Sequence, residues 1–122
     1  MAMKLMTVEI AKALNKATAL MEAHEADLVS VVSTPEDYDS RPVVVKYFTP
    51  DAQCTWFILD GAREGNTWRL FGLCDLGMGC PELGYVMLDD LEKVRGGLGL
   101  PVERDLGYSG TLRDARRQVV HA

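Results

Sequence analysis

The feature that most constrains the fold is a series of short apolar runs, rich in β-branched and aromatic residues, between residues 43 and 88. These runs cover residues 43–48, 55–59, 67–74 and 83–88. The segments between them contain Gly, Pro, Asp or Asn, which is typical of strands joined by turns. Turns are therefore expected at residues 49–52 and 61–66. Strands connected this closely pair antiparallel, so the pattern predicts an antiparallel sheet of three to five strands.

A helical pattern precedes the strands. Thr7 is a suitable N-cap for a helix that begins at Val8, because its hydroxyl can accept a hydrogen bond from the first turn. Apolar and small residues then recur at steps of three and four up to about Val29. The segment is either one long helix or two helices broken near Asn15. A helix followed by hairpin-linked strands predicts an α+β fold, with the N-terminal helix packed on the sheet.

A second, shorter helix is expected near residues 89–95, after the last predicted strand. Asp89 and Glu92 have the spacing of a capping box, and Gly96 is a typical residue to end a helix. Residues 102–106 then predict an edge strand or an extended arm. The short helix should therefore lie at one end of the sheet.

The length of 122 residues favours a single domain. We expect one α+β domain over residues 3–108 and a C-terminal tail over residues 109–122, whose weak helical character favours fraying. Met1-Ala2 precede this domain. The chain is 48% hydrophobic and 25% charged, as ordinary globular domains are, which excludes a disordered chain. Apolar runs do not approach the ~20 residues of a membrane span, so no membrane association is predicted.

Charge and cysteine content indicate the compartment and exclude some ligands. The net charge is −5, and the chain has no basic stripe, so nonspecific nucleic-acid binding is not expected. Three cysteines, Cys54, Cys74 and Cys80, are an odd number, and the N-terminus lacks the apolar core of a signal peptide. Reduced thiols and a cytoplasmic location follow. The cysteine spacing does not fit a zinc site, and the glycine pairs do not fit a nucleotide fingerprint, so neither a metal nor a cofactor is predicted.

The sequence does not contain a recognisable catalytic constellation. None of the serines lies in a nucleophile elbow, and the two histidines, His24 and His121, lie in a helix and in the tail. No catalytic residue is therefore predicted. Several carboxylates lie at strand ends, where a suitably spaced pair would support hydrolysis, so this alternative stays open.

Charged and aromatic residues near the strand ends form the candidate binding site. They are Asp51, Trp56, Asp75, Glu82, Tyr85, Arg95, Glu103, Arg104 and Asp105. In a simple antiparallel meander the first and third strands end on the same side. We therefore expect the Asp51 turn, the loop of residues 75–82 and the segment of residues 103–105 to converge at one end of the sheet. Trp56 and Tyr85 favour core positions, although either could instead anchor a partner.

Two arginines are expected to neutralise the acids that gather at this end. In an extended segment the two acids of residues 103–105 share one face, with Arg104 opposite. This segment is either an edge strand protected by its charges or a source of ion pairs. In the second case Arg104 and Arg95 pair with Asp75 or Glu82 and stiffen the 75–82 loop. The second possibility predicts ion pairs across the end of the sheet.

Four blocks of sequence resemble the bacterial family catalogued as domain of unknown function 2958. The blocks are MKLMT-x-EI, VVVKYFTPDAQCTWF, FGLCDLGMGCPELGYVML and LEKVRGGLGLPVERDL, within residues 3–108. The resemblance implies an accessory protein of plasmids and other mobile genetic elements. Together with the missing catalytic constellation, it suggests a non-enzymatic binding protein with a protein partner. The alternatives are an inhibitor of a host defence nuclease (anti-restriction or anti-CRISPR) that acts through an acidic surface, and a small carboxylate-dependent hydrolase.

Overall fold

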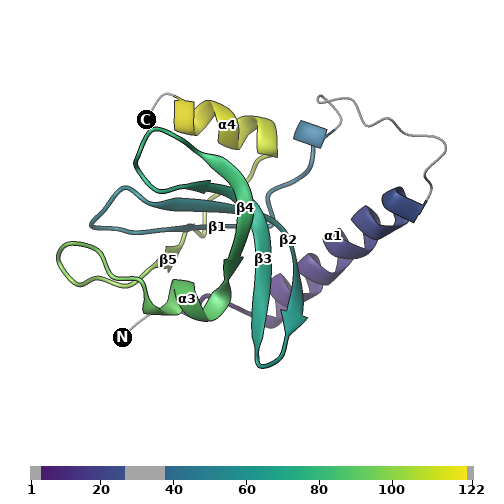
Figure 1. Ribbon diagram of the computed structural model, residues 1–122, viewed down its shortest axis with the longest axis horizontal. Helices are drawn as coiled ribbons and strands as arrows, with labels where there is room; N and C mark the ends of the chain where they lie inside the picture. The colour runs from purple at the N-terminus through teal and green to yellow at the C-terminus, as the bar shows by residue number, and fades with distance from the viewer. Residues whose placement is uncertain (1–3, 27–37, 121–122) are drawn as a thin grey trace.

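A computed structural model describes residues 4–26 and 38–120 of the chain (Figure 1). The elements are α1 (Val8–Ala26), β1 (Val45–Phe48), β2 (Thr55–Glu64), β3 (Thr67–Asp75), β4 (Glu82–Met87), α3 (Leu88–Lys93), β5 (Glu103–Arg104) and α4 (Leu112–Val120). The five strands form one sheet in the order β4-β3-β2-β1-β5, and every neighbouring pair is antiparallel. The predicted α+β fold, with an N-terminal helix and an antiparallel sheet, is confirmed.

Helices cover both faces of the sheet. Helices α1 and α3 pack on one face, which we call the α1 face, and α4 packs on the other, which we call the α4 face (Figure 1). Side chains of β2 alternate between the two cores: Trp56 joins the cluster with Leu14 of α1, whereas Phe57 joins the cluster with Leu112 of α4. Because both faces are buried, β2 carries four consecutive buried residues, 56–59, in place of an apolar–polar alternation.

The start of α1 follows the sequence prediction. The Ile10 N–H donates to the Thr7 hydroxyl at 3.1 Å, so Thr7 is the N-cap. The helix runs without a break to Ala26, and the predicted extension over residues 27–29 lies outside the described residues. Fully buried Leu14 anchors α1 against the sheet.

The turn between β2 and β3 is shorter than predicted. Residues 61–64 continue β2, and the loop consists of Gly65 and Asn66 alone. Gly65 has φ of +62° at the first loop position, where a type II′ hairpin turn requires glycine. The prediction of a turn over residues 61–66 is wrong because Gly61 lies inside a strand that is buried at that point.

The short helix α3 does not use the predicted cap. It begins at Leu88, and its N-cap, Met87, makes no side-chain capping bond. The Asp89 N–H donates instead to the hydroxyl of Thr67 at 3.2 Å. β4 pairs with β3 as far as Met87, and α3 begins at the next residue, Leu88. The N-cap position therefore falls on Met87 and not on Asp89, so the predicted capping box does not form. The helix ends at Lys93, before the predicted stop at Gly96.

The end of the chain forms α4, for which the sequence showed only weak helical character. The Thr111 N–H donates to Asp114 Oδ2 at 2.8 Å, and the Asp114 N–H donates to Thr111 Oγ1 at 3.4 Å. This reciprocal pair is a capping box formed with Asp in place of Glu. Leu112 and Ala115 are fully buried, so α4 contributes to the core on its face of the sheet.

Candidate functional site

The segments that carry most of the predicted site residues meet at one end of the sheet. Phe48 of β1 lies opposite both Thr55 of β2 and Glu103 of β5. Thr55 in turn lies opposite Asp75, where β3 ends, and Glu82 starts β4 beside it. The predicted convergence of the Asp51 turn, the 75–82 loop and the 103–105 segment is therefore confirmed. We call this region the sheet end.

Asp51 holds the glycine-rich loop that follows α3. Its Oδ2 accepts hydrogen bonds from the N–H groups of Leu98 at 2.7 Å and Leu100 at 3.2 Å. A Cβ atom added at Gly96 would overlap the Asp51 carboxylate, so only glycine allows the loop to lie this close. Gly99 has φ of +80°, which also favours glycine. Asp51 thereby fixes a loop that lies 47 residues away in sequence.

Asp75 and Asp105 each bond to the backbone two residues further on. Asp75 Oδ1 accepts from the Gly77 N–H at 3.0 Å, and Asp105 Oδ1 accepts from the Gly107 N–H at 3.1 Å. Asp105 also forms an ion pair with Lys46 at 3.4 Å. Such Asx-turns shape the loops locally. The acids at the sheet end thus stabilise the conformation of the loops that surround them.

Arg95 does not neutralise these acids. Its guanidinium donates to the carbonyl oxygens of Glu92 at 2.9 Å and Val94 at 2.8 Å, both at the end of α3. The carbonyl groups of a helix end lack intrahelical partners, which makes them good acceptors for an arginine. The predicted pairing of Arg95 with Asp75 or Glu82 is therefore wrong.

Arg104 lies on the α1 face, directly across from Tyr47. Burial raises the pKa of the Tyr47 phenol well above its usual value, and the positive charge of Arg104 opposes that rise. Asp75 shares the other face with Glu103, since paired residues of neighbouring strands lie on one face. Glu82 shares the face of Arg104 but lies four strand spacings, about 19 Å, away. The predicted pairing of Arg104 with Asp75 or Glu82 is therefore also wrong.

The two aromatic candidates have different environments. Trp56 is 5% exposed and belongs to the core on the α1 face, as expected. Tyr85 is 66% exposed on the edge strand β4, so its predicted core position is wrong. The Tyr85 ring lies 5.0 Å from the Phe71 ring, and the Arg69 guanidinium lies 5.0 Å from the Tyr85 ring centroid. Tyr85 is thus a surface aromatic held in place by its neighbours.

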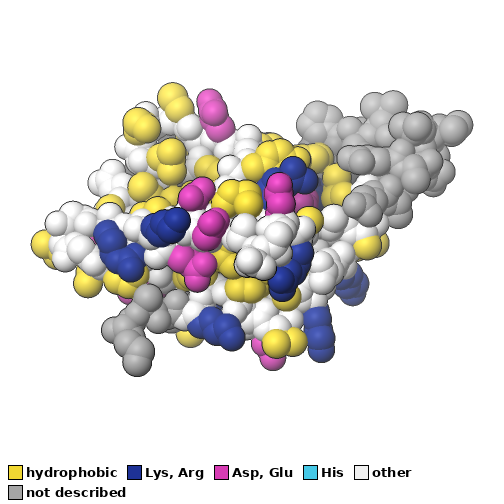
Figure 2. Space-filling view, turned by 60° about the horizontal axis from the view of Figure 1, so that its bottom comes forward, with side chains coloured by type: hydrophobic (Ala, Val, Ile, Leu, Met, Phe, Trp, Pro, Cys, Tyr) yellow, Lys and Arg dark blue, Asp and Glu magenta, His cyan; other side chains and the backbone are white. Residues whose placement is uncertain are grey.

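Two loops at the sheet end expose large apolar side chains. Leu76 and Met78 of the β3–β4 loop are 49% and 76% exposed, and Leu98 and Leu100 of the glycine-rich loop are 83% and 43% exposed. Figure 1 shows both loops at the same end of the molecule as the β1–β2 turn, and Figure 2 shows hydrophobic side chains at that end. We call these four residues the loop surface.

A hollow of about 350 Å³ lies behind the β3–β4 loop at this end. It is lined by Gln53, Thr55, Asp75, Gly77, Gly79, Pro81 and Val119. A second hollow of about 430 Å³, which we call the Arg41 groove, is lined by Thr18, Met21, Tyr38, Arg41, Asp60, Gly61, Ala62, Arg69, Phe71 and Tyr85. Of these residues, sequence reasoning had selected only Asp75 and Tyr85 as site candidates.

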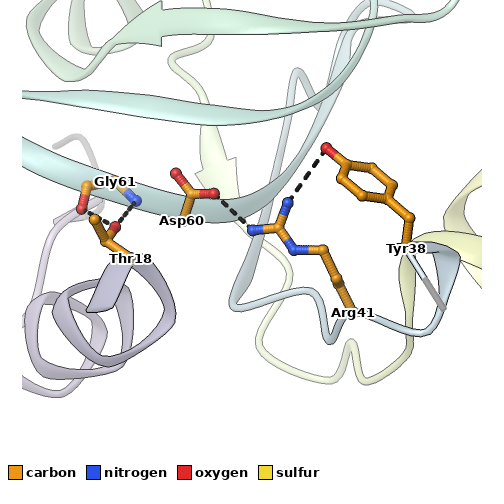
Figure 3. A network of polar contacts seen from close by, with 5 residues as sticks. All are labelled: Thr18, Tyr38, Arg41, Asp60 and Gly61. Atoms are coloured by element: carbon orange, nitrogen blue, oxygen red, sulfur yellow. Dashed lines mark hydrogen bonds and ion pairs between the residues drawn. The ribbon is translucent and has the colours of Figure 1, made fainter. Parts of the chain in front are cut away.

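An ion pair lies in the Arg41 groove (Figure 3). Arg41 Nη2 donates to Asp60 Oδ2 at 2.6 Å, and Arg41 Nη1 donates to the Tyr38 hydroxyl at 3.3 Å. The Arg41 and Asp60 side chains are only 13% and 20% exposed. Beside them, the Thr18 hydroxyl donates to the Gly61 carbonyl at 2.7 Å and accepts from its N–H at 3.2 Å, which ties α1 to β2.

The two hollows constrain the chemistry that they can support. Each is lined by a single carboxylate, Asp75 in the first and Asp60 in the second, whereas hydrolysis of a glycosidic bond typically uses a pair. Over residues 4–26 and 38–120, no His, Cys, Asp and Glu side chains form a group of three that could hold a metal ion. None of the helices in the same ranges is long and apolar enough to cross a membrane.

An N-terminal helix, a five-stranded antiparallel sheet and two further short helices define a small α+β protein, with the β1–β2 turn, the β3–β4 loop and the glycine-rich loop at one sheet end. Residues 5–115 match the family described as "Protein of unknown function (DUF2958)", and the chain belongs to that family. No curated protein and no solved structure matches the chain.

Proposed function

We propose that this is a non-enzymatic binding protein that docks a protein partner on its loop surface, in the accessory role in mobile elements that the sequence resemblance implies. The observation that carries the proposal is the exposure of Leu76, Met78, Leu98 and Leu100 on two loops that lie on either side of the β1–β2 turn. Large apolar side chains gathered on the surface of a small protein are typical of interaction sites.

The two loops are held in defined conformations before any partner binds. Asp51 bonds to two N–H groups of one loop, and Asp75 bonds to an N–H group of the other. A further contact joins the other loop to the β1–β2 turn, because Gly77 packs against Gln53. A surface that is already ordered loses less conformational entropy on association, which favours binding.

The composition of the loops favours a protein partner over a nucleic acid. Residues 76–81 and 96–101 contain only Gly, Pro, Cys, Leu and Met, so neither loop offers a cation to a phosphate backbone. Exposed Glu82 and Arg95 flank this apolar centre, as polar residues flank the centre of many protein interfaces. On the face in Figure 2, acidic and basic side chains are interspersed, which favours docking through apolar side chains over docking through an acidic surface.

The test is affinity capture from a lysate of the native host with a matched pair of variants. The loop variant carries Met78→Asp and Leu98→Asp, and the control carries Val8→Asp and Leu20→Asp on α1, where the side chains are 65% and 55% exposed. We expect a stoichiometric partner with the wild type and the control that is absent with the loop variant. Equal urea midpoints would establish that both variants are folded.

Two results would contradict the proposal: capture of the same partner by the loop variant, or turnover of a substrate by the purified protein. The identity of a captured protein would specify the role further. A nuclease subunit whose cleavage activity falls on binding would identify the protein as a defence inhibitor.

A further inference from the structure

One cation of the Arg41 groove is only loosely paired. Of the three charged residues that line the groove, Arg41 is bound to Asp60, whereas Arg69 has Glu64 at 3.7 Å between half-exposed side chains. A cation held this loosely can exchange its partner for an anionic ligand, because exposed ion pairs contribute little energy. The groove therefore favours an anion.

A β-bulge places the carboxylate of the groove. Register in the β2–β3 pair shifts between Ile58, which lies opposite Gly72, and Asp60, which lies opposite Phe71. Ile58 packs in the core of the α1 face, and regular alternation would send the side chain of residue 60 to that face as well. The bulge turns Asp60 to the α4 face, beside Phe71. Bulges are frequent next to functional sites because they re-aim a single side chain.

Asp60 is fixed on one side and available on the other. Its Oδ2 accepts from Arg41 at 2.6 Å, and Figure 3 shows the second carboxylate oxygen directed away from that guanidinium. Arg41 is held in turn by its bond to Tyr38 and lies 5.3 Å from the centroid of that ring. The free Asp60 oxygen can therefore accept a hydrogen bond from a ligand without disturbing the ion pair.

The other side of the groove is an aromatic platform with an accessible cation. Tyr85 is 66% exposed, and its ring is supported by Phe71 at 5.0 Å. The Arg69 guanidinium lies 5.0 Å from the Tyr85 centroid, and its pairing with Glu64 is loose, at 3.7 Å between half-exposed side chains. Exposed pairs of this kind contribute little energy, so an anion can compete for Arg69.

From this arrangement we propose that the Arg41 groove binds a small aromatic anion. The ligand is a flat ring that carries a phosphate or carboxylate group together with an N–H or O–H donor. The ring lies against Tyr85, the anionic group pairs with Arg69, and the donor bonds to the open oxygen of Asp60. A volume of about 430 Å³ suits a ligand of this size. Nucleoside monophosphates and aromatic carboxylic acids are the two sources of this chemistry.

The proposal is independent of the loop surface. The groove is formed mainly by the half of the β2–β3 hairpin near Gly65, by Tyr85 and by the segment with Tyr38 and Arg41, whereas the loop surface lies at the opposite ends of β2 and β3. Loss of one binding function can therefore be measured with the other intact.

The experiment titrates the full chain with three sets of probes. These are the four nucleoside 5′-monophosphates, the four uncharged nucleosides and 4-hydroxyphenylacetate, each followed by calorimetry and by amide chemical shifts. Arg69→Gln is compared with Arg63→Gln, a matched control, because Arg63 lies on the same hairpin but opposite Trp68, on the α1 face. Tyr85→Leu removes the platform.

We expect an anionic probe to bind at millimolar affinity or better and to shift the amides around Asp60 and Phe71. Arg69→Gln should weaken binding about tenfold, the size of a lost charge-assisted hydrogen bond, and Arg63→Gln should not. Binding of the nucleotides alone, or of the aromatic acid alone, would support the proposal and identify the source. Absence of binding by every anionic probe, equal binding of the nucleosides, or equal losses in the two arginine variants would overturn it.

Discussion

The sheet end and the Arg41 groove both contain carboxylates, but the partners of those carboxylates differ in kind. At the sheet end, Asp51 and Asp75 accept hydrogen bonds from backbone N–H groups. In the groove, Asp60 accepts from a guanidinium that arrives from a different segment of the chain. The first arrangement fixes the shape of loops, whereas the second joins two distant segments of the chain by an ion pair. Asp75 and Asp60 both line a hollow, so the partner of each acid, more than its position, distinguishes the two regions.

The largest expected effect tests how closely Asp51 is packed at the sheet end. Gly96→Ala should reduce the free energy of unfolding by about 3 kcal/mol, because the new methyl group would overlap the Asp51 carboxylate and force the loop away. Gly97→Ala is the matched control, since its methyl group meets no atom within 4 Å. Urea denaturation measures both variants. Equal stabilities would show that the glycine-rich loop does not depend on contact with Asp51.

A smaller effect is expected in the groove. Removal of either partner of the Arg41–Asp60 pair, by Arg41→Met or Asp60→Asn, should cost about 2 kcal/mol, because each change leaves a mostly buried polar group without its partner. A double-mutant cycle should show clear coupling between the two positions. For the exposed Arg69–Glu64 pair the same cycle should give under ~1 kcal/mol. Absence of coupling at Arg41 would mean that the pair has no energetic role.

Much of the fold could be predicted from the sequence because the relevant signals are local. The Thr7 cap and the four β-rich runs each depend on a few neighbouring residues, and the structure confirms the antiparallel sheet that they predict. The sequence also contains the capping-box spacing of Thr111 and Asp114, which predicts a stable helix at α4. Convergence of the Asp51 turn and the 75–82 loop followed from assuming a simple meander, and the strand order β4-β3-β2-β1 agrees with that assumption.

The groove could not be predicted because it depends on contacts between distant segments and on a local irregularity. A regular strand would have placed Asp60 on the α1 face, and sequence periodicity does not reveal the bulge that reverses it. Tyr85 looked like a core residue because its strand is apolar, but β4 lies at the sheet edge. The predicted ion pairs of Arg104 failed for a similar reason, since they required a strand order and a face that sequence does not specify.

The smallest predicted effect concerns an acid that, like Asp51 and Asp75, bonds to the backbone. The Thr111 N–H, followed by the Thr111 hydroxyl, lowers the pKa of the Asp114 carboxyl below its usual value. The ionised form is thus favoured in the folded state, so its stabilising contribution is present above the ordinary carboxyl pKa and is lost as pH falls through the lowered pKa. Carboxyl ¹³C shifts should give a low midpoint for Asp114, and Thr111→Val should raise it. A midpoint at or above the usual carboxyl value would contradict this assignment.

The most direct test of the account is hydrogen exchange at the amides of Leu98 and Leu100, because the part of the loop surface on the glycine-rich loop depends on their bonds to Asp51. In the wild type and in Gly97→Ala, both amides should exchange much more slowly than in an unfolded chain. In Asp51→Ala both should exchange near the unfolded rate, while the amides of β2 and β3 stay protected. Fast exchange of Leu98 and Leu100 in the wild type, or unchanged protection in Asp51→Ala, would contradict the claim that Asp51 holds the glycine-rich loop in place.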